Sequence, residues 1–100
     1  MNYYSVVEVT PTSEEWLPDY VGPAAVFVAK HGGKFLARTS SHERLEGEGE
    51  EVALRVIIEW PSRQAAIDFM SDPGYVPLLQ LRTDGSISHH FLIEGKDDLT

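Results

Sequence analysis

Two polar side chains that follow an apolar stretch have the types needed for acid–base chemistry. The planar guanidinium of Arg38 can bind a carboxylate through two parallel hydrogen bonds. His42 follows four residues later, and an imidazole titrates near neutral pH. We expect an irregularity in the strand between these two residues, and an irregularity beside a cation can form the edge of a binding site for an anionic or carbonyl-bearing ligand. We therefore predict that Arg38 orients an anion and His42 transfers a proton. The alternatives are an ion pair between Arg38 and a glutamate on a neighbouring strand, and a solvated His42.

Five aromatic side chains are expected to lie between the helices and the sheet. An apolar enclosure with a few polar groups is typical of a pocket for a small molecule. The tyrosine hydroxyls among them would need hydrogen-bond partners if they were buried. The alternative is that these rings are ordinary core residues. The predicted pocket-lining residues are Trp16, Tyr20, Trp60, Phe69 and Tyr75.

The other histidines do not form a metal-binding pattern. His89 and His90 are adjacent on an expected strand, so their side chains point to opposite faces of a sheet. The sequence has no cysteine, which excludes disulfides, zinc–thiolate sites and iron–sulfur clusters. His31 is expected at the end of a helix, where an imidazolium interacts favourably with the helix dipole. We therefore predict no metal and no other cofactor.

The composition indicates one small acidic domain. One hundred residues, 42% of them hydrophobic, are enough for a single core, which we assign to residues 1–95 with a polar tail at 96–100. The net charge of −8 would repel a polyanion, so we expect no nucleic-acid partner. No apolar run approaches the roughly 20 residues that a membrane helix needs, so we expect no membrane contact. The absence of cysteine agrees with a reducing compartment, and we expect a cytoplasmic protein.

The first half of the chain predicts a strand, a helix and a second strand. Residues 3–9 are rich in aromatic and β-branched types and end at a proline. Thr12 and Glu15 have capping-box spacing, which predicts a helix from there to about His31. Pro18 and Pro23 lie inside that pattern and predict a kink or two short pieces. Segments 34–39 and 42–46 look extended, with an irregularity expected at residues 40–41.

The second half predicts a strand at residues 52–60, a helix from a cap at Ser62 to Met70, a shorter helical stretch after it, and a strand at 87–93. The order β-α-β-β-α-β predicts an α+β ferredoxin-like fold, a four-stranded antiparallel sheet with two helices on one face. The other face would be bare and partly apolar, with Leu36, Ile57, Leu92 and either Tyr4 or Val6 on it. We therefore expect a homodimer formed through this sheet face.

Four ordered segments resemble the family called domain of unknown function 1330: residues 30–38, 42–47, 58–62 with 65–66, and 72–75. The resemblance implies a dimeric α+β barrel, in which two ferredoxin-like protomers pair their sheets. The same superfamily holds small cofactor-free monooxygenases, muconolactone isomerases and haem enzymes. The family itself has no agreed reaction, and a fold alone does not assign one.

Two functional hypotheses follow. The first is a cofactor-independent isomerase or monooxygenase that acts on a small planar or carboxylated metabolite, with Arg38 and His42 as the acting groups. The second is a non-catalytic small-molecule sensor or stabilising dimer, in which the same pocket only sequesters the ligand. A saturable turnover would support the first hypothesis, and binding without turnover would support the second.

Overall fold

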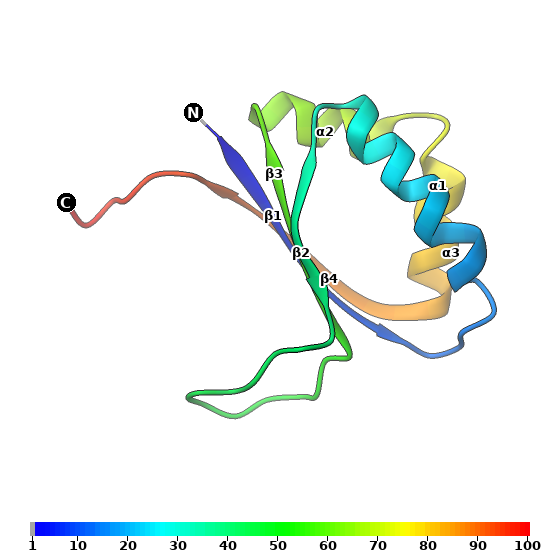
Figure 1. Cartoon of the computed structure of the whole chain (residues 1–100), viewed down its shortest axis with the longest axis horizontal. Coiled ribbons are helices and arrows are strands. Elements are labelled where there is room, and N and C mark those ends of the chain that lie inside the picture. The colour runs from blue at the N-terminus through cyan, green and yellow to red at the C-terminus, as the bar shows by residue number, and fades with distance from the viewer. Residues whose placement is uncertain (1) are drawn as a thin grey trace.

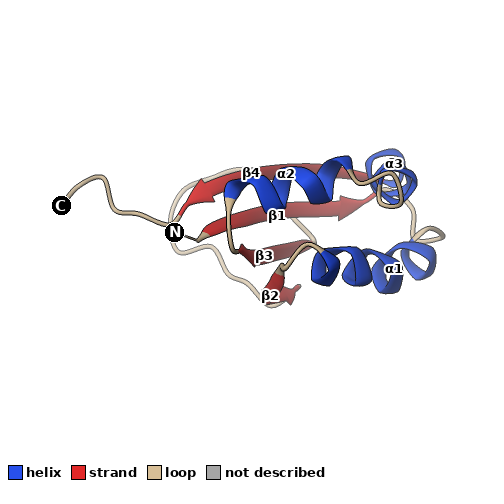
Figure 2. Ribbon diagram, turned by 90° about the horizontal axis from the view of Figure 1, so that it is seen from above, coloured by secondary structure: helices blue, strands red, loops and turns tan. Residues whose placement is uncertain are grey.

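Four antiparallel strands form one sheet, and three helices lie on one side of it (Figure 1). The computed structural model describes residues 2–100. The strands are β1 (Tyr3–Pro11), β2 (Lys34–Thr39), β3 (Leu54–Trp60) and β4 (Ser86–Glu94), and the helices are α1 (Leu17–Lys30), α2 (Arg63–Ser71) and α3 (Val76–Gly85). The strand order is β2-β3-β1-β4, which can be followed in Figure 2. This confirms the α+β ferredoxin-like fold, and α3 is the shorter helical stretch that was predicted to follow the second of its two helices.

The start of α1 is fixed by a long-range contact rather than by the predicted capping box. The helix begins at Leu17, and its N-cap residue, Trp16, makes no side-chain capping hydrogen bond. Instead the Trp16 indole Nε1 donates to the Gly85 carbonyl oxygen at 2.9 Å. A Cβ atom on Gly85 would lie 2.3 Å from that indole, so only glycine permits this approach. The tryptophan thereby joins the start of α1 to the end of α3.

Both prolines of α1 are accommodated in a single helix. Pro18 lies in the first turn, where a missing amide hydrogen is harmless. Pro23 lies inside the helix, which continues past it to Lys30. The prediction of two short helical pieces is therefore wrong.

Strand β2 contains its irregularity earlier than predicted. Phe35 pairs with Ile58 and Ala37 pairs with Ile57, which leaves Leu36 as the extra residue of a β-bulge. The sequence pattern indicated residues 40–41 instead. Residues 40–53 form neither helix nor strand, so the expected extended segment at 42–46 does not belong to the sheet.

The two faces of the sheet have different environments. The helix-facing side carries the buried core residues of β1 and β3: Val7, Val9, Val56, Ile58 and Trp60. On the opposite side, Val6 pairs with both Ile57 and Phe91, which places three apolar side chains in one row. Phe91 is 69% exposed and Ile57 is 37% exposed.

One residue predicted for the bare face lies on the other side. Leu92 packs against the core, and the alternate residues of β4 face outward: Ile87, His89, Phe91 and Ile93. The register of β4 could not be read from a strand that is apolar on both faces. Within residues 2–100, each helix is too short or too polar to cross a membrane.

Candidate functional site

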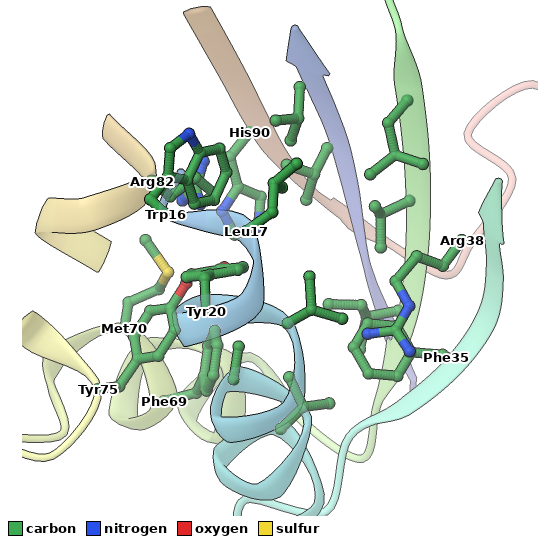
Figure 3. Close-up of a pocket in the computed structure, with 18 of the residues that line it drawn as sticks. Trp16, Leu17, Tyr20, Phe35, Arg38, Phe69, Met70, Tyr75, Arg82 and His90 are labelled. Atoms are coloured by element: carbon green, nitrogen blue, oxygen red, sulfur yellow. The ribbon is translucent and has the colours of Figure 1, made fainter. Parts of the chain in front are cut away.

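A cavity lies between the helix-facing side of the sheet and the helices (Figure 3). Its volume, counted as the space open to the centre of a water molecule, is about 90 Å³. A single water needs only roughly 10–15 Å³ on the same measure. Its walls are mainly aliphatic and aromatic, and its polar side chains are few: Tyr20, Tyr75, Arg38, Arg82 and His90. Such a lining suits a small, largely apolar molecule that carries polar groups.

Two tyrosines face each other in the wall of the cavity. The Tyr20 and Tyr75 hydroxyl oxygens are 2.7 Å apart and share a hydrogen bond. Tyr75 is almost fully buried. Burial raises the pKa of the Tyr20 phenol above its usual value, the Tyr75 hydroxyl raises it further, and the nearby Arg82 guanidinium opposes both effects. Both causes of the rise favour the neutral phenol, so Tyr20 can donate a hydrogen bond at neutral pH.

Arg82 is a buried cation with no anionic partner. The residue is 6% exposed, lines the cavity from the last turn of α3, and forms no ion pair within residues 2–100. An uncompensated charge in an apolar environment is costly, and buried charges are normally paired. An anionic ligand in this cavity would supply the missing partner.

His90 faces the cavity from β4 and is the end of a hydrogen-bonded chain. The indole Nε1 of Trp60 donates to the Ser5 hydroxyl oxygen at 2.8 Å, and His90 Nε2 lies 2.7 Å from the same oxygen. Ser5 is fully buried. Burial lowers the pKa of the His90 imidazole below its usual value, and the nearby charge of Arg82 lowers it further. His90 is therefore neutral at pH 7 and available to accept a proton.

Arg38 reaches the same cavity from the edge strand β2. It pairs with Val56, whose side chain is in the core, so Arg38 also faces the helices. Its guanidinium carbon lies 4.2 Å from the centroid of the Phe35 ring, a cation–π contact that holds the charge in place. Figure 3 shows Arg38 and Phe35 on the opposite side of the cavity from Arg82 and His90.

The turn that carries Tyr75 is held to the end of α1 by a buried carboxylate. Asp72 Oδ2 accepts hydrogen bonds from Lys30 Nζ and from His31 Nε2, both at 2.7 Å, and its Oδ1 accepts one from the Gly74 amide at 2.8 Å. These bonds keep the pKa of Asp72 well below its usual range. His31 thus has a structural partner as well as the predicted position at the helix terminus.

Replacing Asp72 with asparagine is expected to destabilise the fold at pH 7. A carboxyl whose pKa is lowered by folding stabilises the native state above its unfolded pKa, near 4, and this contribution is lost as the pH falls below that value. The stability gap between wild type and Asp72→Asn should therefore narrow below pH 4, as measured by urea unfolding across a pH series. Asp68→Asn, at an exposed carboxylate of α2, is the matched control. A gap that is constant with pH would contradict this account.

The structure brings together only some of the predicted site residues. Trp16, Tyr20, Phe69 and Tyr75 line the cavity, and Arg38 lies at its edge. Trp60 is fully buried behind the cavity wall, where its ring packs against Phe69 with the ring centroids 5.1 Å apart, and it does not itself line the cavity. His42 lies in the exposed loop 40–53, beside Glu43 and Arg44, and does not line the cavity.

Sequence reasoning missed three polar residues of this region: Arg82, His90 and Ser5. Arg82 follows Tyr75 and Leu78 at helical spacing, which is a signal that it shares their inward face. His90 alternates with the inward-facing Leu92 in the same way. Among residues 2–100, no three histidine, aspartate or glutamate side chains gather closely enough to hold a metal ion.

Solved structures with this fold include proteins of different kinds. A protein of unknown function from Rhodopseudomonas palustris is 17% identical, with 96% of this chain and 83% of that chain covered and a TM-score of 0.78. SnoaB, a cofactor-independent oxygenase from Streptomyces nogalater, is 22% identical, with coverage of 98% and 96% and a TM-score of 0.67. A dimeric ferredoxin-like protein of unknown function from Jannaschia sp. CCS1 is 11% identical, with coverage of 94% and 99% and a TM-score of 0.67. At sequence identities this low, the similarity shows only that the fold is shared.

No curated protein matches the sequence. The family described as Domain of unknown function (DUF1330) matches residues 2–96, which include all four strands, all three helices and every residue that lines the cavity. The chain belongs to this family.

Proposed function

We propose that this chain forms a homodimer, binds a small planar or carboxylated metabolite in the cavity, and acts on it without a cofactor as an isomerase or a monooxygenase. The observation that carries the proposal is the buried side chain of Arg82, which has no carboxylate partner within residues 2–100 and lies beside a phenol and a neutral imidazole. Such a group stabilises negative charge that develops on a bound molecule.

The chemistry begins with removal of a proton from the ligand. His90 accepts the proton, the electron pair of the broken C–H bond stays on the ligand as an enolate, and Arg82 with the Tyr20 hydroxyl stabilises the enolate oxygen. A neutral imidazole suits this role because a protonated one cannot accept the proton. His90 therefore replaces His42 as the proposed base, since His42 does not line the cavity.

The enolate has two fates that need no cofactor. In an isomerase, His90 returns the proton to a different carbon, and the double bond moves. In a monooxygenase, molecular oxygen is the oxidant: a methylene carbon loses two hydrogens, which leave with one oxygen atom as water, and the second oxygen atom forms a carbonyl group. The fold of SnoaB, a cofactor-independent oxygenase, supports the second fate as an analogy.

A non-catalytic binding protein is the second candidate. The tautomer of His90 separates the two candidates. If Nε2 accepts the Ser5 hydroxyl hydrogen, Nδ1 carries the ring hydrogen and the imidazole can only orient a ligand, whereas an Nε2 that donates to Ser5 leaves Nδ1 free to accept a proton. The two candidates differ in one measurable property. An enzyme exchanges the acidic hydrogens of its ligand or converts the ligand to product, whereas a binding protein does neither.

His90→Gln is the variant that separates them. The probe is 2-indanone, a planar ketone with acidic methylene hydrogens, and the measurement is deuterium incorporation by NMR in D₂O together with oxygen uptake. Wild-type protein should accelerate exchange, and His90→Gln should lower that rate by about 100-fold or more, the usual range for a general base. Because the pKa of His90 is lowered, the wild-type rate should be flat above pH 6.5 and fall only at lower pH.

His42→Ala is the matched control, since it removes a histidine outside the cavity and should leave the rate unchanged. Equal exchange in wild type and His90→Gln would remove His90 from the mechanism. Binding of 2-indanone without exchange or oxygen uptake would favour the binding protein.

A further inference from the structure

Two arginines approach the cavity from opposite sides, and neither is neutralised by a carboxylate. Arg82 belongs to α3 and is buried, whereas Arg38 belongs to β2 and is exposed (Figure 3). None of the ion pairs within residues 2–100 includes either residue. Acidic residues outnumber basic ones by sixteen to eight, so acidic partners are abundant on this chain. Exposed cations outside the cavity, such as Arg44 and Arg63, also form no ion pair within residues 2–100. What sets the two cavity arginines apart is the burial of Arg82 and the orientation of Arg38 toward the cavity.

The bulge in β2 is what turns Arg38 toward the cavity. In a regular strand, Phe35 and Arg38 would point to opposite faces, because they are three residues apart. The extra residue, Leu36, shifts the alternation, so that Phe35 pairs with Ile58, Arg38 pairs with Val56, and both face the helices. Bulges often redirect a side chain beside a functional site. The Phe35 ring then restricts the guanidinium through the contact at 4.2 Å.

The wall between the two arginines is apolar. It is formed by residues of β1, β3 and α1, among them Val7, Val56, Ile58, Ala24 and Val28. A ligand that spans the cavity must therefore have an apolar middle. It must also overcome the repulsion of an anion by a chain of net charge −8, which one guanidinium at each end would offset locally.

We infer that the metabolite carries an acidic group at each of its two opposite ends, joined by a flat apolar skeleton. Arg82 binds the inner acidic group and Arg38 binds the outer one. This inference rests on the proposed function, because it concerns the ligand of the same cavity, and it goes beyond it by fixing the number and placement of the acidic groups.

Three benzene carboxylates test the inference by titration, with tryptophan fluorescence or calorimetry as the readout. Benzoate has one carboxylate, terephthalate has two at opposite ends, and phthalate has two side by side. We expect wild-type protein to bind terephthalate about tenfold more tightly than benzoate, with no such gain for phthalate. Arg38→Met should reduce terephthalate affinity to that of benzoate. Arg63→Met, at an exposed arginine outside the cavity, should change neither.

The outcomes distinguish this inference from the proposed function. Benzoate binding without a terephthalate advantage, or an advantage that survives in Arg38→Met, would overturn the inference while the proposed function stands. An equal gain for phthalate would also overturn it, because total charge rather than placement would then decide affinity. No binding of any of the three carboxylates would overturn the inference, and no binding of 2-indanone in addition would overturn the proposed function as well. Circular dichroism of each variant verifies that it is folded before titration.

Discussion

Replacing Arg82 with methionine is expected to weaken benzoate binding by at least about 30-fold and, at the same time, to raise the thermal stability of the protein. Truncating one partner of a buried charge pair typically costs about 2–5 kcal/mol of binding free energy. In the free protein the effect has the opposite sign, because Arg82 is buried and forms no ion pair within residues 2–100, and its neighbours Tyr20 and His90 carry no negative charge. Replacing buried ionic groups by apolar ones of similar volume is often neutral or stabilising by about 1–4 kcal/mol.

Arg82→Met also removes a favourable interaction with the helix dipole, but this loss is smaller than the expected gain in stability. Arg82 lies in the last turn of α3, where a cation interacts favourably with the helix dipole by about 0.3–1 kcal/mol. Replacing the buried charge by an apolar side chain removes a larger desolvation cost. The free energy of unfolding of Arg82→Met should therefore exceed that of wild type by roughly 1 kcal/mol or more. For a domain of this size, that corresponds to roughly 4–8 °C in melting temperature.

Calorimetric titration and thermal unfolding of Arg82→Met measure the two quantities separately. Arg63→Met, which removes an exposed arginine at the start of α2, should leave both unchanged. A destabilised Arg82→Met variant that still binds benzoate normally would mean that the guanidinium only packs, and the proposed anion site would then be wrong.

The elements of the fold were predictable wherever the signal was local. Ser62 is a helix cap by type, and its hydroxyl oxygen does accept a hydrogen bond from the Ala65 amide, at 3.1 Å. The alternation in β3 correctly assigned Val56 and Ile58 to the core and Ile57 to the bare face. The capping box at Thr12 failed because the contact of Trp16 with Gly85, residues far apart in the sequence, fixes the start of α1.

The candidate site was less predictable, because its polar groups depend on register and burial. The orientation of Arg38 follows from a bulge at Leu36 that no residue type marks. Arg82 has the right helical spacing, yet arginine is almost always exposed, so spacing alone does not reveal that this face of α3 is buried. His42 has a suitable side chain, but the loop 40–53 does not bring it to the cavity.

Replacing Phe91 with aspartate is expected to convert the proposed homodimer into monomers. Phe91 lies in one row with Val6 and Ile57 on the uncovered face of the sheet and is 69% exposed there. Burial against a second copy would stabilise the dimer by roughly 25 cal/mol for each Å² of apolar surface. An unpaired carboxylate in that interface would oppose it by several kcal/mol. Light scattering at micromolar concentration should therefore give twice 11.2 kDa for wild type and 11.2 kDa for the variant.

Leu45→Asp is the matched control, because Leu45 is also a large apolar side chain and is 85% exposed, but it lies in the loop 40–53 rather than on the sheet. It should remain dimeric, whereas Ile57→Asp should dissociate as Phe91→Asp does. A monomeric wild type would refute the homodimer, and a dimeric Phe91→Asp would locate the interface elsewhere. The cavity lies on the helix-facing side of the sheet, away from Phe91, so the monomeric variant should still bind benzoate. A loss of binding on dissociation would instead mean that the partner subunit completes the site.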